Sequence, residues 1–216
     1  MKFVLHLKHW QLFGLTFALP FALYIVFFIT MISAMVAGQG EPEFGAISII
    51  LGVCIAAAYL VAIVIALSWM WQVATGLYRK LPAGVPMKIN RFYFAFIFPF
   101  VYMIGFVSYM CFVFLNDMKS LEPGPVDGMP PVFGILFLII PLHLVAMACC
   151  FYILYFVAKS LKSVELNREA LVNEYISEFV LIWFSFIGIW FIQPRINKIF
   201  SPEGPAPQPG GALDRM

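Results

Sequence analysis

The sequence predicts an all-α protein: a polytopic transmembrane helical bundle of four spans, followed by a cytoplasmic amphipathic helix and a short C-terminal membrane segment. Two observations predict this class. The 216 residues are 63% hydrophobic and only 11% charged, whereas a soluble domain carries about a quarter charged residues. The chain also contains four long charge-free segments, each longer than the ~20 residues that a helix needs to cross a bilayer.

The charge-free segments predict spans over residues 10–37, 45–77, 92–115 and 131–158. The first run is far longer than the ~7–15 apolar residues of a secretory signal, so we expect it to be retained as a span. All four exceed the length of a perpendicular crossing, which predicts tilt or extension beyond the bilayer. We expect one helical domain over residues 1–200 and a disordered Pro/Gly-rich tail over 201–216.

The charges of the connecting segments predict the orientation of the spans. Positive charge gathers at the N-terminus, after the second span and after the fourth span, in the residues Lys2, Lys8, Arg79, Lys80, Lys88, Arg91, Lys159, Lys162 and Arg168. The other two loops carry mainly acidic residues. Because Lys- and Arg-rich loops remain in the cytoplasm, we expect the N-terminus on the cytoplasmic side of a bacterial inner membrane.

Residues 159–178 combine charged residues with apolar residues at near-helical spacing. Lys162, Glu165 and Arg168 occupy faces other than the apolar one, and neighbouring pairs among them can form ion pairs at i,i+3. We therefore expect an amphipathic helix that continues the fourth span along the cytoplasmic surface. A solvated linker helix is the alternative.

The apolar segment over residues 179–194 is too short for an ordinary span. Its 16 residues extend roughly 24 Å as a helix, less than the ~30 Å hydrocarbon core. A re-entrant hairpin that breaks near Gly188 would return Arg195 to the side where Glu174 and Glu178 enter, close enough to pair. A short fifth span is the alternative, but it would place positive charge outside, so the charge pattern favours the hairpin.

The phrase FIGIWFIQPRIN, from Phe186 to Asn197, resembles the C-terminal end of a group of uncharacterised multi-span proteins of bacterial inner membranes. In that group a similar phrase follows a polar helix, and LKHWQLF near the N-terminus of this chain resembles the same group. The C-terminal resemblance covers roughly the last quarter of the chain. It implies a location in the inner membrane and carries no activity.

Small residues at four-residue spacing predict helix-packing faces in the second and fourth spans. They are Gly52, Cys54, Ala58, Ala62 and Ala66 in the second span, and Ala146 and Cys150 in the fourth. Small side chains let membrane helices approach closely. We therefore expect these two spans to pack centrally; a face for another subunit is the alternative.

The candidate functional polar residues are Gln72, His143, Glu174, Glu178 and Arg195. An ionisable residue inside a span, such as His143, is a functional candidate by default. No second His or carboxylate accompanies it at depth, which favours a neutral His hydrogen-bonded to a neighbouring helix over a haem ligand or proton relay. The charged residues near the C-terminus could bind a lipid headgroup or a partner, although mutual salt bridges are the simpler interpretation.

The sequence lacks the common catalytic, metal-binding and phosphate-binding motifs. It contains no GxSxG, HExxH or glycine-rich phosphate loop, and its cysteines form no CxxC. We therefore predict no catalytic, metal-binding or cofactor-binding residue, and the net charge of +2 does not indicate a nucleic-acid partner. The expected partners are membrane lipids, other membrane-protein subunits or a second copy of the chain.

The sequence therefore favours a non-enzymatic accessory or scaffold subunit of an inner-membrane assembly. The first alternative is a small transporter or channel for an uncharged or lipid-like solute. The second alternative is a lipid-modifying membrane enzyme that uses the charged residues near the C-terminus.

Overall fold

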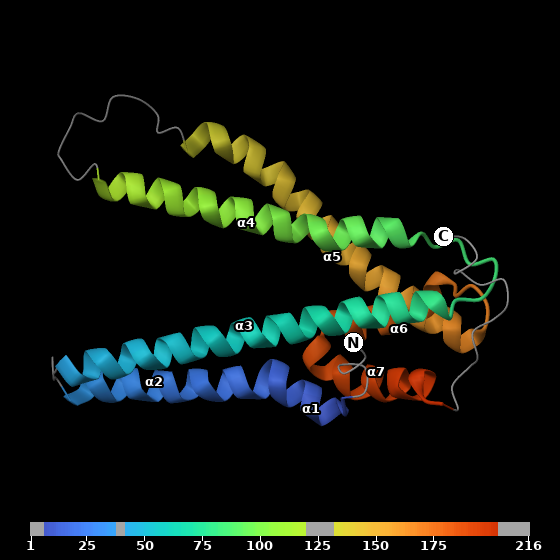
Figure 1. Ribbon diagram of the computed structural model, residues 1–216, viewed down its shortest axis with the longest axis horizontal. Helices are drawn as coiled ribbons and strands as arrows, with labels where there is room; N and C mark the ends of the chain where they lie inside the picture. The colour runs from blue at the N-terminus through green and yellow to red at the C-terminus, as the bar shows by residue number, and fades with distance from the viewer. Residues whose placement is uncertain (1–6, 38–41, 120–131, 203–216) are drawn as a thin grey trace. The chain divides into compact units, whose positions relative to one another are not determined.

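The computed structural model describes residues 7–37, 42–119 and 132–202 (Figure 1). All secondary structure in these ranges is helical, which confirms the predicted all-α class. Among the described residues, four helices are long and apolar enough to cross a membrane: His9–Val36, Ile47–Arg79, Ile89–Val113 and Ile139–Leu166. Large apolar side chains along them are exposed, as expected where lipid is the solvent. Most of each acidic loop, at residues 38–41 and 120–131, and the tail beyond residue 202 lie outside the described residues.

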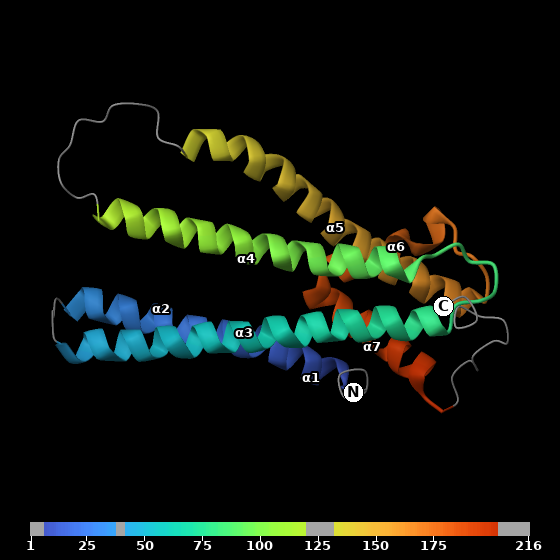
Figure 2. The same cartoon turned by 45° about the horizontal axis from the view of Figure 1, so that its top comes forward.

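Two compact units make up the chain, and the first contains residues 1–85 and 157–216. Its long helices, α2 (Leu19–Ala37) and α3 (Pro42–Arg79), lie side by side in both views (Figures 1 and 2). The short helix α1 (His9–Phe13) and the π-helical turn η2 (Gly14–Ala18) precede α2. Pro20 has no N–H for the carbonyl four residues earlier, and the π-helical turn lies directly before it, with the Leu19 N–H bonded to the Gly14 carbonyl.

The C-terminal part of the first unit departs from the predicted single helix over 159–178. Helix α5 (Val132–Leu166) ends before this stretch is complete, and α6 (Val172–Trp183) begins after a short turn. Asn167 starts the turn in the left-handed region, with φ 52°, a conformation that Asn adopts more readily than most residues. The prediction of one continuous amphipathic helix is therefore wrong, because the chain turns at Asn167.

A tight helical hairpin follows, formed by α6 and α7 (Ser185–Phe200) and joined by Phe184 alone. The backbone leaves the helical region at Phe184, with φ −87° and ψ 58°, so the predicted break at Gly188 is wrong. Gly188 instead lies within α7, where a Cβ atom would be 1.7 Å from the carbonyl oxygen of Leu181. The absence of a side chain at this position allows α7 to fold back on the end of α6.

The buried core of the first unit lies where α7 meets the C-terminal ends of α3 and α5. Its fully buried apolar residues include Leu12, Val73, Leu77, Val157, Leu161, Ile192 and Ile196. On α3, α5 and α7 they recur every fourth residue, which is the spacing of one helix face. The apolar face of α7 is therefore buried against protein at this end of the unit.

The second unit, residues 86–156, contains α4 (Ile89–Lys119) and the first part of α5. The ring centroids of Phe92 and Phe156 are 4.9 Å apart, and those of Tyr102 and His143 are 5.8 Å apart. As residue numbers rise along α4, those of the contacting residues on α5 fall. The two helices are therefore antiparallel neighbours within this unit.

Candidate functional site

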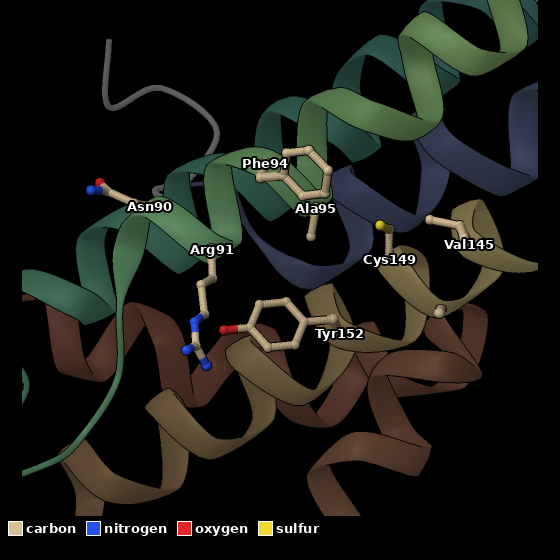
Figure 3. Close-up of a pocket in the computed structure, with 8 residues that line it drawn as sticks. Asn90, Arg91, Phe94, Ala95, Val145, Cys149 and Tyr152 are labelled. Atoms are coloured by element: carbon tan, nitrogen blue, oxygen red, sulfur yellow. The ribbon is translucent and has the colours of Figure 1, made fainter. Parts of the chain in front are cut away.

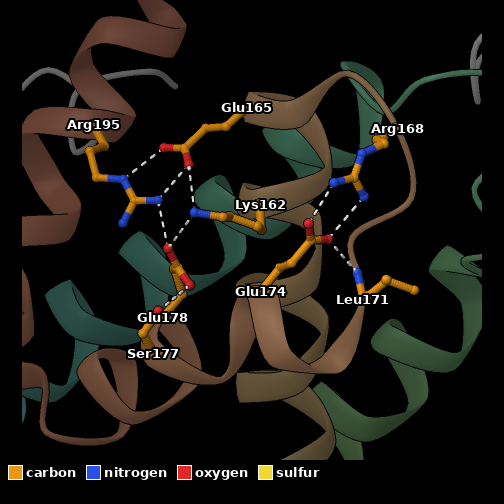
Figure 4. A network of polar contacts seen from close by, with 8 residues as sticks. All are labelled: Lys162, Glu165, Arg168, Leu171, Glu174, Ser177, Glu178 and Arg195. Carbon is orange, nitrogen blue, oxygen red and sulfur yellow. Dashed lines mark hydrogen bonds and ion pairs between the residues drawn. The ribbon is translucent and has the colours of Figure 1, made fainter.

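Eight charged residues from the end of α5, from the turn that follows it, from α6 and from α7 form a network of six ion pairs, part of which is drawn in Figure 4. We call this network the ion-pair cluster. Its members are Lys159, Lys162, Glu165, Arg168, Glu169, Glu174, Glu178 and Arg195.

Glu178 on α6 is the most buried member, with its side chain only 4% exposed. It accepts hydrogen bonds from Arg195 Nη2 at 2.8 Å, from Lys162 Nζ at 3.3 Å and from the Ser177 hydroxyl at 2.8 Å. The Arg195 guanidinium also donates through Nε and Nη2 to the two carboxylate oxygens of Glu165 on α5. One guanidinium therefore connects α7 to both α5 and α6 (Figure 4).

The electrostatics of this group favour the charged forms. Burial would raise the pKa of Glu178, but hydrogen bonds from Arg195 and Ser177 outweigh this effect and hold the pKa below its ordinary value. The hydrogen bond to Glu165 raises the pKa of Arg195, and burial opposes this only in part. Both partners therefore remain ionised at neutral pH and act as a cross-link between helices.

A second pair fixes the turn between α5 and α6. Arg168 donates from both Nη atoms to the two carboxylate oxygens of Glu174, and the Leu171 N–H donates to Glu174 Oε2 at 2.8 Å. The hydrogen bond from Arg168 and then that from Leu171 lower the pKa of Glu174 to about 2. Glu174 also satisfies a backbone N–H at the start of α6, where helices otherwise lack partners.

The predicted pairings are correct only in part. Arg195 and Glu178 do meet, as the hairpin hypothesis requires, and Lys162 lies 3.9 Å from Glu165. The anticipated pair between Glu165 and Arg168 does not form: Glu165 bonds to Arg195, and Arg168 bonds to Glu174. Tertiary partners displace the local i,i+3 partner because they offer two parallel hydrogen bonds each.

Gln193, a buried amide beside the cluster, was not among the functional residues predicted from the sequence. Gln193 on α7 is fully buried. Its Oε1 accepts from Trp69 Nε1 at 2.6 Å, and its Nε2 donates to the Leu7 carbonyl at 2.9 Å and to Asn197 Oδ1 at 3.1 Å. The sequence feature that could have indicated it is the single amide side chain in an otherwise apolar run. This residue joins α7 to α3 and to the segment that precedes α1.

Lys80, directly after α3, binds the other end of α7. Its Nζ donates to the Ile199 carbonyl at 2.7 Å and lies 5.4 Å from the ring centroid of Phe200. A cation at a helix C-terminus interacts favourably with the last carbonyls and the helix dipole. Burial lowers the pKa of this lysine.

The two candidate residues inside the spans have different surroundings. His143 faces Tyr102 on α4, with the tyrosine hydroxyl 3.2 Å from His143 Nδ1. Gln72 on α3 has a buried Oε1 for which the described part of the chain offers no hydrogen-bond partner. His143 and Gln72 lie in different units, so the structure does not bring them into one site.

The predicted packing residues differ in burial. Ala62 and Ala146 are buried, Gly52 and Ala58 are half-buried, and Cys54, Ala66 and Cys150 are exposed. Within the first unit, α3 packs against α2 and η2. Central packing of the second span against the fourth stays a prediction, because Ala146 and Cys150 belong to the other unit.

The second unit contains a groove between α4 and α5 (Figure 3). The sequence analysis did not predict this groove. Its volume is about 520 Å³, and the residues that define its two walls include Arg91, Phe94, Ala95, Val145, Cys149 and Tyr152. The polar side chains lie at one end, and the remaining wall is apolar. The sequence feature that could have indicated the groove is the presence of three small residues on the facing helices: Ala95, Ala148 and Cys149.

The fold and these contacts define a helical membrane protein whose charged residues around α6 and α7 are largely bound to one another. No protein-family model matches the chain, and no curated protein or solved structure shows significant similarity to it. The resemblance of the FIGIWFIQPRIN segment to inner-membrane proteins therefore stays a prediction.

Proposed function

We propose that this protein is a non-enzymatic accessory or scaffold subunit of a membrane assembly, in which the α6–α7 hairpin is the element presented to other subunits. The observation that carries the proposal is the double attachment of Arg195. Its guanidinium binds Glu165 and Glu178 at once, so the charged groups hold the hairpin in place. A fixed hairpin suits docking because little conformational entropy is lost on binding.

The surface of the hairpin supports this role. Large apolar side chains at the turn are exposed: Trp183, Phe184, Phe186 and Ile187 each show 45% or more of their surface. Aromatic residues with an apolar body are enriched in protein interfaces and at membrane surfaces. In the proposed role this end of the hairpin contacts lipid and neighbouring transmembrane helices.

We place the protein in a bacterial inner membrane with its N-terminus in the cytoplasm. Support comes from the first unit, where Leu7, Lys80 and the ion-pair cluster all contact α7 or lie beside it. Three of the segments that carry positive charge in the sequence therefore meet at one end of this unit. Positive charge marks the cytoplasmic side of membrane proteins.

A crosslinked purification tests the proposal. Tagged full-length protein is crosslinked in its native membranes, extracted in mild detergent and compared with Arg195→Met and Arg79→Met. Arg195→Met removes the double attachment, whereas exposed Arg79 at the end of α3 takes part in no ion pair with the described residues. We expect a defined membrane-protein partner at fixed stoichiometry with the wild type and Arg79→Met, and its loss with Arg195→Met.

Two results would contradict this role. If all three proteins purify alone or only as homo-oligomers, the transporter alternative is favoured over a scaffold. If Arg195→Met retains the partner at full stoichiometry while its hairpin becomes protease-sensitive, the hairpin is not the docking element. Membrane insertion and helix content, measured by circular dichroism, show whether each variant is still folded.

A further inference from the structure

We propose that the groove between α4 and α5 binds one anionic phospholipid, with its phosphate on Arg91 and an acyl chain along the apolar wall. This inference concerns the second unit alone and does not depend on the scaffold role. The occupant follows from three features of the groove: its polar end, its apolar length and its uncompensated positive charge.

The polar end is formed by Arg91 near the start of α4 and by Tyr152 on α5. In Figure 3 the Arg91 side chain extends toward the tyrosine hydroxyl. A guanidinium can donate two parallel hydrogen bonds to a phosphate, and a phenol can donate a third. Tyrosine also favours the headgroup level of a bilayer, where a phospholipid phosphate lies.

The apolar part of the groove begins next to its polar end. Ala95 and Phe94 lie one turn further along α4, and Cys149 and Val145 lie one and two turns back along antiparallel α5. Ala95 and Cys149 are buried, so small side chains form the floor of the groove. From Tyr152 to Val145 the wall extends about 10 Å along the helix, which an acyl chain covers and a free headgroup does not.

The positive charge at this end is not neutralised by an ion pair in the part of the chain that the structure describes. Arg91 and Lys88 are both exposed and take part in none of the ion pairs between described residues. The first turn of α4 contains no acidic residue, so no carboxylate within that turn offsets the positive end of the helix dipole. Basic pockets between transmembrane helices bind anionic lipid headgroups.

Native mass spectrometry of the full-length protein in mild detergent tests the site. Palmitoyl-oleoyl phosphatidylglycerol is the anionic probe, and the phosphatidylcholine with the same chains is the zwitterionic probe. We expect one phosphatidylglycerol to be retained, with phosphatidylcholine bound about tenfold more weakly. Arg91→Gln should weaken phosphatidylglycerol binding about tenfold, the effect of losing one charge-assisted contact.

Two further variants separate a lipid from other occupants. Ala148 lines the groove and is exposed, so Ala148→Leu fills the groove without entering the core and should weaken binding of both lipids. Arg79→Gln removes a basic residue outside the groove and should leave binding unchanged. Circular dichroism and thermal unfolding verify that each variant is folded.

Four outcomes would overturn the inference. Equal retention of both lipids by the wild type and Arg91→Gln would mean non-specific lipid contact only. Displacement of phosphatidylglycerol by inorganic phosphate would identify a simple anion site. Unchanged lipid binding in Ala148→Leu would exclude an acyl chain from the groove. A lipid-free dimer that is disrupted by Ala148→Leu would identify a second copy of the chain as the occupant.

Discussion

Replacement of Gly188 by alanine should open the α6–α7 hairpin. The added Cβ would lie 1.7 Å from the Leu181 carbonyl oxygen and 2.5 Å from its carbonyl carbon. Both obstacles are backbone atoms, so no change of rotamer relieves the clash. Since ordinary van der Waals contact begins near 3.4 Å, the two helices must separate by about 1.7 Å at this point.

The energetic cost follows from what this separation disrupts. Overpacking of a close-packed site costs about 1–3 kcal/mol. Displacement of α7 also weakens the contact of Arg195 with Glu178; breaking a fully buried pair costs about 3–5 kcal/mol, and the Arg195 side chain is 30% exposed, which reduces that figure. We expect a total of about 3–4 kcal/mol. The higher helix propensity of alanine returns at most about 1 kcal/mol.

Thermal unfolding of the purified protein in mild detergent measures this effect. At about 2–4 °C per kcal/mol for a chain of this size, Gly188→Ala should lower Tm by about 10 °C. Gly52→Ala is the matched control, because its Cβ would meet nothing within 4 Å. Gly76→Ala should lie between them, since the three atoms nearest to its Cβ all belong to the Phe200 ring, the first at 2.6 Å, and a side chain can move where backbone cannot. A Gly188→Ala protein as stable as Gly52→Ala would refute the hairpin geometry.

Three other predictions test neighbouring contacts. Acidification should destabilise the turn before α6. The pKa of Glu174 is about 2 in the folded protein and about 4.3 in the unfolded chain. The contribution of Glu174 to the free energy of unfolding is therefore complete above the higher pKa and is lost as the pH falls toward the lower one. Glu174→Gln should flatten the dependence of Tm on pH over this interval. Trp69→Phe should lower the free energy of unfolding by about 1–3 kcal/mol, because the buried Gln193 Oε1 loses its indole donor; Trp10→Phe, at a position 55% exposed, should change it by less than about 0.5 kcal/mol. A cysteine at Gly210 should resist impermeant thiol reagents in cells stripped of their outer barrier, whereas ready labelling would mean that the chain crosses the membrane after α6.

The membrane-spanning helices were predictable because composition alone determines them. Long apolar runs without charge have only one stable form in a bilayer, and their length exceeds the span by a wide margin. The turn at Asn167 was not predictable in this way. The amphipathic pattern of α5 continues into α6, so periodicity does not mark the break, and the left-handed conformation of Asn167 is one that the residue permits but does not require.

The candidate site was predictable only as far as charge and topology determine it. A chain that folds back between Glu178 and Arg195 must bring opposite charges together, and the structure contains that pair. Arg168 and Arg195 are chemically equivalent donors. That Glu165 pairs with Arg195 and not with the predicted Arg168 therefore depends on where α7 packs. Burial of Gln193 likewise results from tertiary packing against Trp69, which a local pattern cannot specify.

The geometry of the hairpin also bears on how it meets a bilayer. Glu178 and Arg195 are 17 residues apart, which would separate them by about 25 Å in one straight helix, yet their charged atoms are 2.8 Å apart. An apolar hairpin can enter lipid only if its turn leaves no backbone group unsatisfied. At Phe184 the N–H donates to the Val180 carbonyl, and its own carbonyl accepts from Ile187 and Gly188. The turn residue therefore satisfies its own polar groups, which is one condition for a hairpin that dips into the membrane with its charged residues together on one side.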